Sequence, residues 1–258
     1  MWSDGAMEHG FGIDFGGTGI KGAPVNLDTG LFAEERVRIT TPDKSTPKAI
    51  AKVFKELLAQ FPDSTGPVGI TVPGVVVGGV VKSASNIDRE WIGVDSDALF
   101  TEALGRDVHV INDADAAGLA EARYSAAKGH RGVVIVTTLG TGIGSALLYD
   151  GVLVPNSELG HIEIDGHIAE QRAANSVREE KGLSWKKWAE RLTDYYATLE
   201  RLFTPELFVV GGGVSKESAE FLPLIEIETP IVPAGLLNTA GVVGAALNAA
   251  LGAAAARG

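Results

Sequence analysis

The sequence predicts an α/β fold of two related domains, and two observations lead to this prediction. A short apolar strand, a turn crowded with glycine and a return strand occupy residues 12–27 and recur at 132–149. The tetrapeptide Gly-Thr-Gly-Ile stands in both turns, at 17–20 and at 140–143. The two copies lie about half the chain apart, which indicates two related domains rather than a solenoid, whose repeats are about 20–50 residues long.

Between the hairpins, the spacing of apolar residues marks helices and strands. Apolar residues at the helical i, i+3, i+4, i+7 spacing predict a helix over 48–61, which Pro62 ends. Asp95 or Ser96 caps a short second helix that runs to Leu104, and Gly105 stops it. The strands expected here are 36–40, 68–72, a hairpin over 75–81, and 108–111.

The second half of the chain continues this alternation. An alanine-rich helix is expected over 114–127, directly after the strand at 108–111. Polar residues at that junction stand at the carboxyl end of a strand, where α/β folds place ligands. The remaining expected elements are a return strand at 145–149, an amphipathic helix at 184–203, a strand at 207–210 and a final helix at 238–251.

The segment 229–256 carries no charged residue, so a membrane span has to be considered. Prolines, glycines and asparagines interrupt the segment, and its apolar side chains are mostly alanine. A spanning helix needs about 20 predominantly apolar residues. We therefore expect a loop followed by a buried helix from about Asn238, and no membrane association.

Composition narrows the classes of partner and cofactor. The 258-residue chain has a formal net charge of −11, which disfavours nucleic acid as a partner. It contains no cysteine, which excludes disulfides, thiolate zinc sites and cysteine nucleophiles. Residues 1–10 lack the apolar core of a secretory signal, and the expected location is the cytoplasm.

Both glycine turns have the residue types of a phosphate-binding loop, although an ordinary glycine-rich hairpin would look similar. Glycine lets backbone N–H groups approach an anion without a Cβ in the way. The expected phosphate ligands of the first turn are Gly16, Gly17, Thr18, Gly19 and Lys21. Asp14 precedes them and is expected to hold a Mg²⁺ ion, directly or through water. The corresponding ligands of the second turn are Thr138, Gly140, Thr141 and Gly142.

Four stretches carry a resemblance to a known family, in the family's own order. They are Asp14-Phe15-Gly16-Gly17-Thr18, Asn112-Asp113-Ala114-Asp115-Ala116-Ala117, Leu139-Gly140-Thr141-Gly142-Ile143-Gly144 and Glu158-Leu159-Gly160-His161. On these stretches the chain resembles the ROK (repressor, open reading frame, kinase) family of bacterial sugar kinases. The resemblance implies a two-domain actin/hexokinase-like (ribonuclease H-like) fold with a cleft between the domains.

The resemblance also implies how the chain divides. Residues 1–111, completed by the C-terminal helix at about 238–258, are expected to form a small N-terminal domain. Residues 112–237 are expected to form a larger C-terminal one. Relatives are commonly dimers, so a homodimer is expected.

Family motifs assign candidate roles to polar residues around the sugar. The expected sugar contacts are Asn86, Asn112, Asp113, Glu158, His161 and Glu170. Asp113 matches the family's catalytic base, whereas by spacing alone it caps a helix equally well. Asn86 has the alternative of a simple turn residue. In many relatives the histidine of the last motif also binds zinc with three cysteines; this chain has none, so His161 is left with the sugar and no zinc is expected.

The expected function is a kinase that moves a phosphate to the 6-hydroxyl of glucose, with mannose as another acceptor. Similarity to the family's polyphosphate-using branch implies inorganic polyphosphate and ATP as donors, and an ATP-only glucokinase is the alternative. A polyphosphate track would use basic side chains, for which the candidates are Lys21, Lys82, Lys128, Arg131 and Lys216.

Two rival functions come from other classes of protein. A sugar-responsive repressor of this family carries a helix-turn-helix module, for which the residues ahead of the first hairpin are too few. A non-catalytic actin-like protein would have no use for the Glu158–His161 motif.

Overall fold

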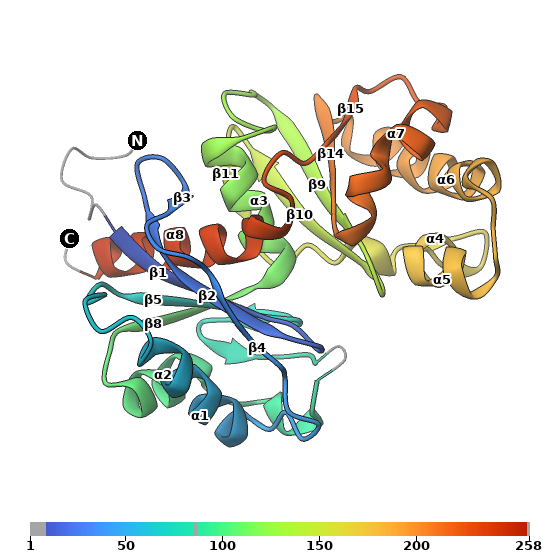
Figure 1. The fold of residues 1–258 in the computed structure, drawn as a ribbon. Coiled ribbons are helices and arrows are strands. Elements are labelled where there is room, and N and C mark those ends of the chain that lie inside the picture. Colours follow the sequence, from blue (N-terminus) through green and yellow to red (C-terminus); the bar gives the residue numbers. More distant parts are fainter. Residues whose placement is uncertain (1–8, 85–86, 257–258) are drawn as a thin grey trace. The chain divides into compact units, whose positions relative to one another are not determined.

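A computed structural model describes residues 9–84 and 87–256 of the chain (Figure 1). It divides into two compact units, Met1–Ala120 with Thr239–Gly258 and Glu121–Asn238. The division after Ala120 falls inside helix α3 (Asp113–Tyr124), whose first residues belong to the first unit. We refer to these as unit 1 and unit 2.

The sheet of unit 1 is built around the first glycine hairpin. Its strands run in the order β3-β2-β1-β5-β8, and β4 pairs with β2 beside β3. The hairpin strands are antiparallel, while β5 and β8 continue the sheet in parallel with β1. The bounds are β1 His9–Phe15, β2 Ile20–Asn26, β3 Leu31–Phe32, β4 Val37–Ile39, β5 Val68–Val72 and β8 Val108–Asn112.

Helices cover both faces of this sheet because β1 alternates large and small residues. Phe15 of β1 packs edge-on against Phe54 of α1 (Pro47–Leu58), and α2 (Ser96–Leu104) joins the same core through Phe100. On the other face, α8 (Ala240–Ala255) lies so close that a Cβ on Gly12 would stand 1.9 Å from the Val242 carbonyl oxygen. Glycine is therefore required at that contact for packing.

Unit 2 repeats the same strand order around the second hairpin, β11-β10-β9-β14-β15. Its strands β9 and β10 are antiparallel, and β14 and β15 run parallel to β9. The bounds are β9 Val133–Leu139, β10 Ile143–Tyr149, β11 Val152–Val154, β14 Leu207–Gly211 and β15 Ile231–Pro233. The two mixed sheets of this kind confirm the predicted α/β class.

A long helix, α6 (Trp185–Phe203), covers one face of the unit 2 sheet, as expected from its amphipathic pattern. Ser184 caps it by accepting a hydrogen bond from the Lys187 N–H. Tyr196 of α6 shares a 2.7 Å hydrogen bond with buried Thr137 of β9, and burial raises the pKa of that tyrosine. A second core cluster fills the opposite face of the sheet.

Shorter elements complete the described chain. They are the strands β6 Val76–Val77, β7 Val80–Val81, β12 Glu163–Ile164 and β13 His167–Ile168, the α-helices α4 Glu170–Ala173, α5 Asn175–Glu180 and α7 Ser218–Phe221, and 3₁₀ turns at Arg89–Trp91, Leu159–His161, Gly213–Glu217, Leu222–Leu224 and Leu237–Thr239. The pair β6–β7 confirms the hairpin expected over 75–81.

The loop expected before the final helix contains a strand that the sequence prediction missed. Ile231–Pro233 forms β15, which pairs with β14 at the edge of the sheet. Pro233 lies in this strand, which is possible because an edge position tolerates a residue without an N–H. Two helices are shorter than expected. Helix α1 ends at Leu58 rather than at residue 61, and α3 ends at Tyr124 rather than at residue 127.

Among the described residues, one helical segment, Leu237–Ala255, is long and apolar enough to cross a membrane by length and composition. Half of it is buried inside the protein, where α8 packs against β1, β5 and β8. Close backbone approaches at Gly12, Gly69 and Gly244 fit this helix to the core of unit 1.

Candidate functional site

The first glycine turn joins β1 to β2 and is closed by backbone hydrogen bonds. The Gly16 N–H donates to the Gly19 carbonyl at 3.1 Å, and the Thr41 hydroxyl donates to the Gly16 carbonyl at 2.6 Å. Gly17 and Thr18 are exposed at the tip of the turn. The turn is therefore a fixed loop that presents its tip to solvent.

Polar side chains form a row across four neighbouring strands at the base of this turn. Strand register places Arg38 of β4 opposite Lys21 of β2, Lys21 opposite Asp14 of β1, and Asp14 beside Thr71 of β5. Directly paired residues point to the same face of a sheet. The register therefore brings two cations, one carboxylate and one hydroxyl together on the face that α8 covers.

Two hydrogen bonds and one close packing contact fix the Asp14 side chain in this row. Its Oδ2 accepts a 2.9 Å hydrogen bond from the Lys21 ammonium, and its Oδ1 accepts a 3.1 Å hydrogen bond from the Thr71 hydroxyl. Gly241, in the first turn of α8, lies so close that a Cβ there would stand 2.9 Å from the Asp14 carboxylate. The Asp14 side chain is 20% exposed, so its carboxylate still reaches solvent.

The Asn112-Asp113 pair stands where β8 passes into α3. The Asn112 Oδ1 caps the helix by accepting hydrogen bonds from the N–H groups of Ala114 and Asp115, and its Nδ2 donates to the Gly74 carbonyl. Asp113 is exposed between buried neighbours, and its Oδ1 accepts from the Ala114 N–H at 2.9 Å. The side chain of Asn112 is thus the main cap of α3, and the exposed Asp113 carboxylate stands at the junction of β8 and α3.

The second glycine turn is closed in the same way and is clamped by α5. The Gly140 N–H donates to the Gly142 carbonyl at 3.0 Å. Ser176 of α5 donates twice to the turn, through its N–H to the Gly140 carbonyl and through its hydroxyl to the Thr141 carbonyl. A Cβ on Gly140 would meet no atom within 4 Å, and Thr141 is exposed, so this turn also presents its tip to solvent.

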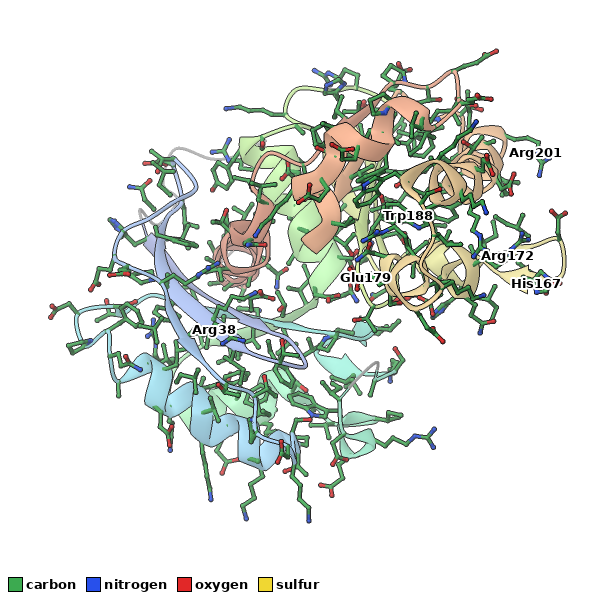
Figure 2. The ribbon with its side chains drawn as sticks, turned by 45° about the vertical axis from the view of Figure 1, so that its right-hand side comes forward. Arg38, His167, Arg172, Glu179, Trp188 and Arg201 are labelled. Atoms are coloured by element: carbon green, nitrogen blue, oxygen red, sulfur yellow. The ribbon has the colours of Figure 1, made fainter. Side chains whose placement is uncertain are left out.

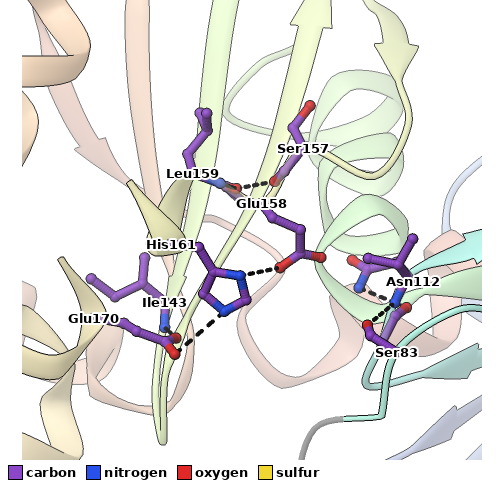
Figure 3. A network of polar contacts seen from close by, with 11 residues as sticks. Ser83, Asn112, Ile143, Ser157, Glu158, Leu159, His161 and Glu170 are labelled. Atoms are coloured by element: carbon purple, nitrogen blue, oxygen red, sulfur yellow. Dashed lines mark hydrogen bonds and ion pairs between the residues drawn. The ribbon is translucent and has the colours of Figure 1, made fainter. Parts of the chain in front are cut away.

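His161 lies between two carboxylates in unit 2, as Figure 3 shows. Its Nδ1 is 3.9 Å from Glu158 Oε2, and its Nε2 is 3.4 Å from Glu170 Oε1. The 3₁₀ turn that carries His161 packs closely on β10, because a Cβ on Gly160 would stand 2.1 Å from the Ile143 carbonyl oxygen. A carboxylate-imidazole-carboxylate row offers acceptors and a donor to neighbouring hydroxyl groups.

Glu170 connects this row to the second glycine turn. Its Oε2 accepts a hydrogen bond from the Ile143 N–H at 3.1 Å, while its Oε1 faces His161. A Cβ on Gly142 would stand 2.4 Å from the same Oε2, so only glycine leaves room for the carboxylate. One side chain therefore fixes both the turn and the imidazole.

The structure groups the predicted site residues into two sets. Unit 1 holds Asp14, Gly16, Gly17, Thr18, Gly19, Lys21, Asn112 and Asp113, and unit 2 holds Thr138, Gly140, Thr141, Gly142, Glu158, His161 and Glu170. Asn86 lies outside the described residues. Sequence reasoning missed Arg38, Thr71 and Ser176, because strand register and a contact over 35 residues bring them to the site.

Comparison with known sequences places the chain among characterised relatives. The sequence profile of the ROK family matches residues 10–180. A polyphosphate glucokinase of Mycobacterium tuberculosis is 49% identical over 242 residues, which cover 93% of this chain and 91% of that protein. The identity extends well beyond the four motifs.

Solved structures agree with these relatives. The inorganic polyphosphate/ATP-glucomannokinase from Arthrobacter sp. strain KM superposes with a TM-score of 0.91 at 52% identity, covering 95% of this chain and all of that one. A ROK family glucokinase from Streptomyces griseus, in complex with glucose and AMPPNP, superposes with a TM-score of 0.80 at 25% identity over 93% of this chain and 99% of that one.

Proposed function

The chain belongs to the ROK family, and from that membership we propose that it is a hexose kinase. It transfers the terminal phosphate of inorganic polyphosphate, or of ATP, to the 6-hydroxyl of glucose, and mannose is a second acceptor. The observation that carries this proposal is the 49% identity to a polyphosphate glucokinase over 93% of the chain. The likeness to the inorganic polyphosphate/ATP-glucomannokinase of Arthrobacter supports both donors and both sugars.

Asp113 is the general base in this proposal. Its carboxylate is exposed, while Asn112 provides the side-chain cap of α3 by accepting from two backbone N–H groups. A base that removes the proton from the attacking hydroxyl as the phosphate is transferred contributes about 10²–10⁴-fold to rate. Asn112 has both acceptor bonds of its Oδ1 engaged, so its contact with the sugar is through Nδ2 as a donor.

Glu158, His161 and Glu170 orient the sugar in this proposal. The imidazole lies within 3.9 Å of both carboxylates, so the three groups present a short row of alternating acceptor and donor atoms. Hydroxyl groups on adjacent sugar carbons match such a row. Asn86 is proposed as a further sugar contact on family resemblance alone.

The donor anion is bound by the two glycine turns in this proposal. The N–H groups of Gly16 and Gly140 close the two turns, and both turns expose their tips, so it is the N–H groups at the tips that would meet phosphate oxygens. Polyphosphate and ATP share a terminal phosphate followed by a bridging oxygen. The same turns therefore serve either donor at the end that reacts.

The chemistry of Asp14 fits a magnesium ion held through water. Mg²⁺ prefers oxygen ligands, keeps several waters, and is often bound by one or two carboxylates together with substrate phosphates. Asp14 supplies one carboxylate, 20% exposed and fixed by Thr71 and Lys21. When bound, the metal neutralises charge on the phosphates. Asp14 would hold it, and Lys21 and Thr71 keep the carboxylate oriented.

Gly241→Ala tests the position of Asp14. Alanine favours a helix over glycine by about 1 kcal/mol, so the fold is expected to stay intact. Its Cβ would stand 2.9 Å from the Asp14 carboxylate, which must shift. We expect the Mg²⁺ concentration for half-maximal activity to rise several-fold, measured by magnesium titration. Asn248→Ala in the same helix is the control, and an unchanged magnesium requirement in Gly241→Ala would disprove the role of Asp14.

Two expectations about the whole molecule are also part of the proposal. The protein is proposed to act in the cytoplasm and to form a homodimer, the second on family resemblance. Sedimentation of the purified protein measures the second directly, and a monomer at micromolar concentration would refute it.

A panel of donors and acceptors tests the proposed activity. Purified protein with Mg²⁺ is assayed with polyphosphate or ATP against glucose or mannose. The proposal expects activity with polyphosphate and with ATP. Activity with ATP and none with polyphosphate of any length would leave an ATP-only glucokinase, and sugar binding without phosphorylation by either donor would leave a regulator.

A further inference from the structure

The charge of Lys21 is already neutralised within the protein. Its ammonium donates to Asp14 at 2.9 Å, and the two side chains are 29% and 20% exposed. A cation paired with a carboxylate at this distance forms a nearly neutral pair, which attracts an approaching anion only weakly. A polyanion at the first turn therefore needs another cation.

Arg38 supplies that cation. It lies on β4 in direct register with Lys21, and Figure 2 shows it on the strands of unit 1. Its Nη2 donates to the Thr18 carbonyl at 3.1 Å, which fixes the guanidinium against the turn. Within residues 9–84 and 87–256, no carboxylate forms an ion pair with Arg38.

Gly19 makes this position possible. A Cβ at residue 19 would stand 2.7 Å from both Nε and Nη2 of Arg38, so any larger residue would displace the guanidinium. Gly19 has no positive φ, so space for Arg38 explains this glycine better than backbone conformation does. The turn is thus built with an exposed, uncompensated guanidinium at its side.

We infer that Arg38 binds phosphate groups of the donor that are not transferred, as part of the first glycine turn. The inference rests on the proposed function and names one residue of the polyphosphate site. A guanidinium has five N–H donors in a planar fork that matches phosphate oxygens, and one of its nitrogens already anchors it to Thr18. Condensed phosphate is the ligand class, since it continues as a chain of anions past the turn.

The test compares three variants in which charge and shape change separately. Arg38→Gln removes the guanidinium, and Arg38→Lys keeps the charge without the fork. Arg36→Gln is the matched control, because it removes the same charge two residues away, where the guanidinium lies over the Phe32 ring. Each is assayed for the KM of polyphosphate and of glucose at several salt concentrations, and for binding of tripolyphosphate by calorimetry.

We expect Arg38→Gln to raise the KM for polyphosphate and the Kd for tripolyphosphate about tenfold or more. The KM for glucose should match that of Arg36→Gln, and the polyphosphate KM should depend less on salt than in the wild type. Arg38→Lys should recover part of the loss. These outcomes distinguish two roles for Arg38. If Arg38 binds the ligand, the effect of its loss depends on salt, whereas if it only supports the turn, the effect is the same at every salt concentration.

Equal polyphosphate KM and tripolyphosphate Kd in Arg38→Gln and Arg36→Gln would overturn the inference. A loss that is the same at low and at high salt would also overturn it. Failure of the proposed function is a different result, because then the wild-type protein itself shows no turnover with polyphosphate. Tripolyphosphate binding still tests Arg38 in that case, since it needs no turnover.

Discussion

Asp113→Asn is expected to lower the turnover of glucose by about 10²–10⁴-fold while glucose binding is retained. Asparagine cannot take up the hydroxyl proton, but its side-chain oxygen can still accept from the Ala114 N–H, as Asp113 does at 2.9 Å. Asn112 continues to cap α3, so the junction should keep its structure. Steady-state kinetics give the turnover, and calorimetry with glucose gives the binding constant.

The matched control for this variant is Asp63→Asn, which makes the same change at an exposed position of unit 1. It should have wild-type turnover. If Asp113→Asn retained turnover close to that of the control, Asp113 would not be the base, and its carboxylate would have only the local role of accepting from Ala114.

Glu170→Ala is expected to reduce kcat/KM by about 10²-fold or more, because one side chain serves two parts of the site. The change removes the acceptor of the Ile143 N–H beside the second glycine turn and the partner of His161 Nε2. A buried N–H left without an acceptor costs about 1–3 kcal/mol, so the turn should loosen. We expect higher KM values for both glucose and the donor.

Glu170→Gln separates the two roles of this residue. Glutamine still accepts from Ile143 through its carbonyl oxygen but loses the charge that faces His161. The donor KM should therefore return toward the wild-type value, while the glucose KM stays raised. Glu163→Ala, at the exposed position of β12, is the control. A glucose KM that rises alone in Glu170→Ala, with the donor KM unchanged, would refute the connection between turn and imidazole.

Much of the fold was predictable because it is encoded locally. The two hairpins are visible as repeated strand-turn-strand sequences, and each proves to be the centre of a sheet with the same strand order. Helix α6 shows its pattern and its cap in sequence, with Ser184 directly before Trp185. The ROK family, inferred from four short motifs, is confirmed by a profile match over residues 10–180.

The parts that escaped prediction depend on contacts between distant residues. Nothing near Arg38 in the sequence indicates that β4 pairs with β2 in register with Lys21. The Thr71 hydroxyl reaches Asp14 from a strand 57 residues away. Glu170 was expected only as a further sugar contact, and its bond to the Ile143 N–H depends on how α4 packs against the second turn. The roles of the site residues are predictions, and the variants described above test them.

Phosphorus NMR of a single reaction mixture tests the central claim most directly. Wild-type protein is incubated with Mg²⁺, inorganic polyphosphate and glucose, and in parallel with 6-deoxyglucose, which lacks the accepting hydroxyl. The account predicts a phosphate ester on C6 of glucose, formed as the polyphosphate chain shortens, and no ester with 6-deoxyglucose. Release of inorganic phosphate alone, or an ester at another carbon, would contradict it.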